Sequence, residues 1–196
     1  PGSLVGSEMC IRDSYNSYVN INFFDSQKLF YLKNAIEINS IYSNPIISLL
    51  TLINAESHNF TAESLFKNAS YTWNNNDYSK LKNWLGNKGL PINNTIFADA
   101  SGLSRRNKIT TRLIVLFLDK MKYSKDFKAY QSTLSIMGVR GTLSKRFANS
   151  ELSGKFFGKT GTLSNVFALS GYLYKNESPI IISIIPVSYT HLTLPT

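Results

Sequence analysis

Apolar residues recur at helical spacing through the middle of the chain. After Pro45, which suits the first position of a helix, they follow that spacing to about Ala55 and predict a helix. Four more helices are predicted: one beginning near Thr61, one after the polar cluster 74–77 and ending around Gly86 and Gly89, one beginning at Thr110 or Thr111, and one over 124–132. Residues 15–45 have no clear period, so short strands and helical turns both fit them.

The C-terminal part of the chain predicts strands instead. An apolar stretch that contains Lys159 is followed by predicted strands over about Val166–Tyr174 and Ile180–Ile185. The turn between these two strands is short enough for a hairpin, so they are expected to pair antiparallel. A shorter strand is expected over 95–98, and 134–143 is expected to form a bent, apolar connection.

Length and composition allow one globular domain. The chain has 196 residues, 43% of them hydrophobic and 17% charged, and its longest apolar runs are too short to span a bilayer. Its two ends resemble translated read-through of a sequencing adapter. We therefore expect 1–14 and 186–196 to be sequencing artefacts and 15–185 to be the C-terminal part of one domain. Cys10 falls in the first artefact, so no disulfide and no thiol nucleophile is expected.

The net charge of +9 raises the question of an anionic partner. The lysines are spread through sequence rich in Asn and Ile, without a basic run or an alternation of basic and aromatic residues. Nucleic-acid binding is therefore not expected, whereas an anionic cell-wall polymer is compatible with the charge. Outside the two ends His58 is the only histidine, and a lone histidine makes no metal site.

Candidate chemistry is concentrated in Lys159-Thr160-Gly161, on the predicted strand. This triplet combines a cation, a hydroxyl and a residue without a side chain, which together suit a carboxylate and a closely approaching substrate backbone. It is one of three motifs shared by penicillin-binding proteins and class A β-lactamases. The alternative is that Lys159 has no catalytic role and is a solvated lysine at the start of a strand. Ser57 and Asn59 form a second candidate motif, Ser-x-Asn, for which a helix C-terminal cap is the alternative.

Four stretches in the same order resemble the low-molecular-mass penicillin-binding proteins of the D-alanyl-D-alanine carboxypeptidase/endopeptidase type. They are the Ser-x-Asn and Ala-Glu helix, the Asp-Ala-Ser-Gly-Leu-Ser-Arg loop, an apolar Gly-x-x-Gly-Thr-Leu segment and the Lys-Thr-Gly strand, at 53–65, 99–105, 134–143 and 159–163. The loop departs from the family pattern by an alanine in place of its first glycine. The resemblance implies an α+β fold of the β-lactamase/transpeptidase type, an antiparallel sheet flanked by helices, incomplete in this chain. Exposed apolar edges and poor solubility are expected to follow.

The resemblance also implies roles for single residues. Ser57 would relay a proton toward the leaving amine, Asn59 would hydrogen-bond the substrate amide, and Lys159 would supply positive charge for the terminal carboxylate.

Four further residues would bind substrate. Thr160 would contact its carboxylate, Gly161 would leave room for it, and the backbone of Thr162 would help to form the oxyanion hole. Arg105 would either bind substrate or pin its loop through Asp99.

The family's nucleophile lies on a Ser-x-x-Lys helix that precedes the other motifs, so it is expected upstream and absent from this chain. Ser64 and Lys67 have that spacing but follow Ser-x-Asn, so an exposed position on a helix surface is the preferred interpretation.

The implied function is a periplasmic serine-type D-alanyl-D-alanine carboxypeptidase/endopeptidase that acts on peptidoglycan peptides, is acylated by β-lactams, uses no cofactor or metal and is inactive as this fragment. The alternatives are a serine β-lactamase and a non-catalytic wall-binding homologue. The Ala-Glu helix and the 99–105 loop argue against the first, and upstream sequence would decide the second.

Overall fold

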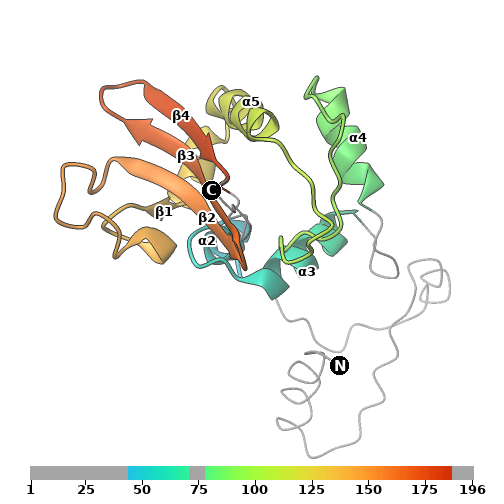
Figure 1. Cartoon of the computed structure of the whole chain (residues 1–196), viewed down its shortest axis with the longest axis horizontal. Helices are drawn as coiled ribbons and strands as arrows, with labels where there is room; N and C mark the ends of the chain where they lie inside the picture. Colours follow the sequence, from blue (N-terminus) through green and yellow to red (C-terminus); the bar gives the residue numbers. More distant parts are fainter. Residues whose placement is uncertain (1–43, 71–77, 187–196) are drawn as a thin grey trace, which may run out of the picture. The chain divides into compact units, whose positions relative to one another are not determined.

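An antiparallel sheet is the main element of the computed structural model, which describes residues 44–70 and 78–186. Within these residues the sheet has four strands in the order β1-β2-β3-β4: Ser135–Ile136, Phe156–Leu163, Val166–Tyr174 and Pro179–Ile184. Each strand pairs antiparallel with its neighbour, with Lys159 opposite Ser170 (Figure 1). The predicted hairpin is confirmed. So is the implied fold class, because the sheet is accompanied by helices.

The helices fall close to the predicted ranges. They are α2 (Ile46–Asn54), α3 (Asn59–Ser70), α4 (Ser79–Asn87), α5 (Thr111–Lys122) and α6 (Phe127–Ser132). Thr110 caps α5 as expected, because its hydroxyl accepts a hydrogen bond from the backbone N–H of Leu113 at 3.1 Å. By contrast, α3 begins two residues before Thr61. The ring Nδ1 of His58 accepts the Thr61 N–H at 3.3 Å and so satisfies one of the free donors of the first turn.

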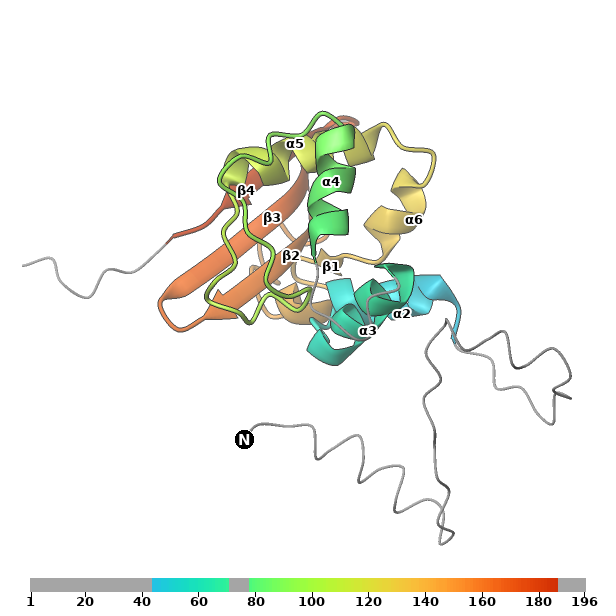
Figure 2. The ribbon, with the colours of Figure 1, turned by 90° about the vertical axis from the view of Figure 1, so that its right-hand side faces the viewer.

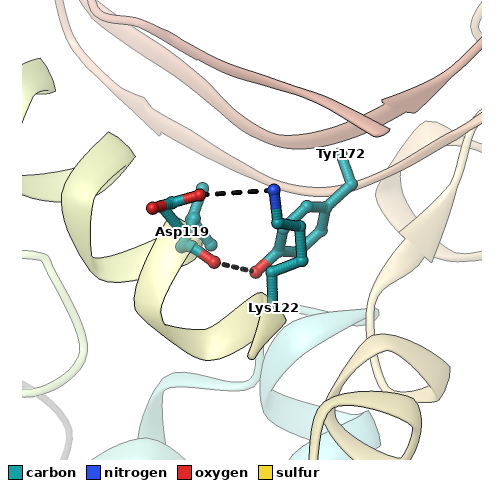
Figure 3. A network of polar contacts seen from close by, with 4 residues as sticks. Asp119, Lys122 and Tyr172 are labelled. Carbon is teal, nitrogen blue, oxygen red and sulfur yellow. Dashed lines mark hydrogen bonds and ion pairs between the residues drawn. The ribbon is translucent and has the colours of Figure 1, made fainter. Parts of the chain in front are cut away.

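One face of the sheet is covered by α5 and α6. Side chains alternate between the two faces of a strand, and Phe157 of β2 lies opposite Tyr172 of β3 on this face. Tyr172 is fully buried beside Leu118 of α5, and its hydroxyl donates to the Leu118 carbonyl oxygen at 2.8 Å (Figure 3). Figure 3 also shows the neighbouring ion pair between Asp119 and Lys122, at 3.4 Å. The buried hydroxyl bond fixes α5 against the sheet.

The other face is covered by the 137–143 segment, which includes the short 3-10 helix η2 (Gly141–Leu143). Gly141 has a φ of +69°, and a Cβ there would lie 2.5 Å from the Ala55 carbonyl oxygen. That carbonyl accepts hydrogen bonds from the Thr142 N–H at 3.0 Å and the Ser135 hydroxyl at 2.9 Å. These hydrogen bonds connect the end of α2 to the sheet. Helices α2 and α3 lie side by side next to the sheet (Figure 1 and Figure 2).

Several predictions need correction or lie outside the described residues. The expected strand over 95–98 is reduced to a single bridge between Ile96 and Lys108, and Trp84 is 50% exposed although it belongs to the predicted apolar stripe. The helix expected over 124–132 is helical from Phe127 only. Apart from Pro186, the proposed artefacts lie in parts that the structure does not describe, and so do the ambiguous 15–43 stretch and the 74–77 cluster.

Apolar surface is exposed in the described part of the chain, as the sequence analysis expected. The apolar helix α2 has no buried residue, and Ile180 and Ile184 on β4 are each 53% exposed. No helix of the described residues is long and apolar enough to cross a membrane.

Candidate active site

Ser57 occupies the turn between α2 and α3 in an unusual backbone conformation. Its φ of +60° lies in the left-handed region, which costs a residue other than glycine about 1–2 kcal/mol. The anchored carbonyl of Ala55 and a hydrogen bond from the His58 N–H to the Leu52 carbonyl oxygen hold the turn in place. A strained backbone conformation persists only where the surrounding structure holds it, and such residues are common at active sites.

Lys159 reaches Ser57 from β2, across 102 positions of sequence. Its Nζ donates to the Ser57 hydroxyl oxygen at 2.7 Å and to the Thr160 carbonyl oxygen at 2.8 Å. Burial lowers the pKa of the Lys159 ammonium below its usual value. The two motifs thus meet, as the sequence predicted, and Lys159 is half-buried and bonded rather than a solvated surface lysine. Ser57 lies two residues beyond Ala55, the C-cap residue of α2.

This contact sets the direction in which Ser57 can act. Because its oxygen accepts a hydrogen bond from Lys159, its own hydroxyl hydrogen is available to a group in front of it. Among the described residues no other partner is recorded for this hydroxyl. A hydroxyl held by an ammonium whose pKa is lowered can pass a proton outward and receive one from behind.

A cavity of about 880 Å³ opens in front of this pair. It is lined by all seven residues that the sequence proposed for the site: Ser57, Asn59, Arg105, Lys159, Thr160, Gly161 and Thr162. Asn59 is the exposed first residue of α3, and Gly161 and Thr162 are exposed on β2. The structure brings the predicted residues together, while the individual roles of Asn59, Gly161 and Thr162 stay predictions.

Thr160 makes an unexpected contact. Its side chain is 8% exposed, and its hydroxyl donates to the Thr142 hydroxyl oxygen at 2.8 Å. The Thr142 hydroxyl in turn lies 3.1 Å from that of Ser135. A substrate carboxylate would have to compete with Thr142 for this hydrogen, and the predicted contact of Thr160 stays a prediction. Sequence reasoning assigned Thr142 no role, although it lies in the quoted Gly-Thr-Leu segment.

Of the two roles considered for Arg105, pinning the loop through Asp99 has no support in the structure. The Asp99 carboxylate accepts from the backbone N–H of Gly102 at 2.8 Å and of Ser104 at 2.6 Å, and from the Asn107 side chain at 2.7 Å. Within the described residues Arg105 forms no ion pair with it. The guanidinium is exposed at the cavity, so substrate binding is the role that stays predicted.

The serines with Ser-x-x-Lys spacing lie away from the cavity. Ser64 and Lys67 are on α3, half-buried rather than exposed as expected, and neither lines it. Sequence reasoning missed a second occurrence of this spacing, Ser79 and Lys82, at the start of α4. These two line a separate hollow of about 300 Å³, where the Lys82 Nζ donates to the Thr95 carbonyl oxygen at 3.2 Å. No cluster of His, Cys, Asp or Glu in the described part of the chain could hold a metal ion.

Comparison with known families agrees with this arrangement. The sequence model of the D-Ala-D-Ala carboxypeptidase 3 (S13) family matches residues 31–189, most of the chain. The chain belongs to this family. The order of the four motifs had indicated a resemblance to penicillin-binding proteins of the carboxypeptidase type. The family match agrees with that resemblance.

Two curated relatives support the assignment. D-alanyl-D-alanine carboxypeptidase DacB of Haemophilus influenzae is 30% identical over 139 residues, which are 67% of this chain and 29% of that protein. The D-alanyl-D-alanine carboxypeptidase of an Actinomadura species is 32% identical over 106 residues, 52% of this chain and 20% of that protein. The chain thus spans less than a third of the length of either relative.

Solved structures show the same fold. Penicillin binding protein 4 (dacB) of H. influenzae, complexed with a β-lactam, superposes with a TM-score of 0.66 at 28% identity, covering 79% of this chain and 38% of that one. A predatory endopeptidase of Bdellovibrio bacteriovorus superposes with a TM-score of 0.60 at 21% identity, over 73% of this chain and 37% of that one. The second likeness concerns the fold alone.

Proposed function

We propose that this chain supplies the Ser57 and Lys159 side of the active site of a periplasmic serine-type D-alanyl-D-alanine carboxypeptidase/endopeptidase. The substrate would be a peptidoglycan stem peptide, and β-lactams would acylate the same site. The observation that carries the proposal is the 2.7 Å contact between the Lys159 Nζ and the Ser57 hydroxyl oxygen, at a cavity lined by all the predicted site residues. Membership of the peptidase family supports the reaction class.

In the proposed reaction a serine hydroxyl attacks the carbonyl carbon of the penultimate D-alanine, and the peptide C–N bond breaks. The nucleophile's proton goes to its neighbouring base. Ser57 gives its own proton to the leaving amine and is reprotonated by that base, so the nucleophile's proton is in effect relayed to the amine. Lys159 stabilises both the Ser57 oxygen and the substrate carboxylate. Water then hydrolyses the acyl ester and regenerates the serine. This route needs no cofactor.

The attacking serine is proposed to lie on a Ser-x-x-Lys segment outside this chain. This proposal is supported by the position of the two occurrences within the chain, because neither Ser64 nor Ser79 lines the cavity. Ser57 itself is not followed by a lysine at the required spacing, since Phe60 stands there.

Labelling with a fluorescent penicillin tests the function. The full-length protein is expected to form a stable adduct, which mass spectrometry should place on a serine outside residues 1–196, whereas the isolated chain should form none. Ser57→Ala in the full-length protein should slow acylation on the order of 10²–10⁴-fold without moving the adduct. Ser178→Ala, in the exposed β3–β4 turn, is the matched control and should change nothing.

Other outcomes would overturn the proposal. An adduct on Ser57, Ser64 or Ser79 would show that this chain carries its own nucleophile. Rapid turnover of penicillin without a lasting adduct would indicate a β-lactamase. A full-length protein that is folded but never labelled would indicate a non-catalytic homologue.

A further inference from the structure

The loop 99–107, which includes Arg105, forms one side of the cavity. Seven consecutive residues from Asp99 to Arg105 line the cavity, together with Ser57 and Lys159. The Asp99 carboxylate organises the loop internally through its bonds to the backbone and to Asn107. These bonds set the shape of the loop, but they do not fix its distance from α3.

Glu63, to which the proposed reaction gives no role, connects the loop to α3. Glu63 lies on α3, one helical turn after Asn59. Its Oε1 accepts from the backbone N–H of Ala100 at 2.6 Å and of Ser101 at 3.0 Å. One carboxylate oxygen therefore joins two consecutive amides of the loop to the helix that begins at the active site. Hydrogen bonds to a charged acceptor are stronger than neutral ones.

Glu63 is itself held from its other side. Its Oε2 accepts the hydroxyl hydrogen of Tyr78 at 2.9 Å, and Tyr78 is only 6% exposed and stacks on Phe66 at 4.7 Å between ring centroids. Burial, and then the hydrogen bond to Glu63, raise the pKa of Tyr78 to about 12. The phenol thus remains a hydrogen-bond donor at any physiological pH. Both oxygens of the Glu63 carboxylate therefore accept hydrogen bonds.

We infer that Glu63 is a positioning residue that fixes the 99–107 loop relative to the Asn59 end of α3, and thereby sets the width of the peptide-binding cavity. This inference rests on the proposed function. Glu63 does not line the cavity and touches no reacting group. Its effect should therefore appear in peptide affinity more than in the chemical step, because a misplaced wall weakens binding of the substrate chain.

The test compares Glu63→Ala with three other variants of the full-length protein. Glu63→Gln keeps the shape and an acceptor oxygen. Tyr78→Phe keeps the stacking but removes the hydroxyl. Glu151→Ala removes an exposed carboxylate that forms no ion pair within the described residues. Three readouts are needed: amide exchange at Ala100 and Ser101, KM and kcat for a D-Ala-D-Ala peptide, and the rate of acylation by a small penicillin.

Glu63→Ala should speed exchange at Ala100 and Ser101 and raise KM on the order of tenfold, with kcat within about threefold of the parent. Glu63→Gln should restore KM to within about threefold, and Tyr78→Phe should have a smaller effect than Glu63→Ala. Glu151→Ala should match the parent protein. If Glu63→Ala fails to fold, Glu63→Asp replaces it, because one CH₂ less should withdraw the carboxylate from the loop and raise KM in the same direction.

Unchanged exchange at the two amides, or an unchanged KM in a folded Glu63→Ala variant, would refute the inference. A loss confined to kcat would also refute it. Failure of the proposed function would look different, because the parent protein would then not be acylated at all. In that case amide exchange at Ala100 and Ser101 still decides whether Glu63 holds the loop.

Discussion

Replacing Lys159 by methionine separates its catalytic from its structural role. Methionine has a similar length, fits a half-buried position and carries no charge. We expect Lys159→Met to slow acylation of the full-length protein by penicillin on the order of 10²–10³-fold, as when one stabilising donor is removed from an active site. We expect its free energy of unfolding to change by less than about 1 kcal/mol.

The small stability effect follows from opposing terms at the same ammonium. Lys159 donates two hydrogen bonds, at 2.7 and 2.8 Å, and a bond that involves a charged group contributes about 1.5–3 kcal/mol. Moving an ion out of water opposes this by several kcal/mol. The lowered pKa of Lys159, caused by burial, shows the same penalty. Because methionine removes both terms, they should nearly cancel.

The pH dependence gives an independent check. The lowered pKa means that the folded protein gives up the Lys159 proton at a lower pH than the unfolded chain, whose lysine has its usual pKa of 10.5. Below the folded-state pKa the burial penalty is fully present. Between the two pKa values the unfolded chain binds more protons, so this group makes stability rise with pH. Acylation that needs the cation should fall over the same window, and both trends should be absent in Lys159→Met.

The assays are the acylation rate with fluorescent penicillin and urea unfolding at several pH values. Lys159→Arg serves as the matched charged control, and it should not restore activity because a planar guanidinium does not reproduce a compact ammonium. Acylation at the parental rate in Lys159→Met would refute the catalytic role. A loss of more than about 3 kcal/mol in stability would instead mark Lys159 as a structural residue.

Two further predictions concern the sheet, and urea unfolding measures both. Gly171→Ala should lower the free energy of unfolding by more than about 2 kcal/mol, because a Cβ would lie 2.2 Å from the Phe157 carbonyl oxygen. Gly161→Ala, whose Cβ would find nothing closer than 3.4 Å, should change it by less than about 0.5 kcal/mol, and equal effects would contradict the packing argument. Tyr172→Phe should lower it by about 1 kcal/mol through loss of the bond to the Leu118 carbonyl, and no change would show that this bond contributes nothing.

The fold could be predicted largely from local signals. The apolar period located the helices, because each must bury a stripe of side chains, and turn residues located the β3–β4 hairpin. The errors have two origins, a local side-chain contact at the start of α3 and the direction in which α4 packs. The His58 ring starts α3 before Thr61, and Trp84 remains exposed despite its place in the apolar stripe.

From the sequence by itself, the order of four short motifs predicted that Ser57, Asn59, Arg105 and the 159–162 strand lie at one site, and all of them line the same cavity. Only the tertiary structure decided what each one touches. The contact between Lys159 and Ser57 joins residues 102 positions apart, and the Thr160 hydroxyl turned out to face Thr142. The order of the motifs along the sequence predicts which side chains gather at a site. Their directions depend on backbone strain, sheet register and packing that no local stretch of sequence contains.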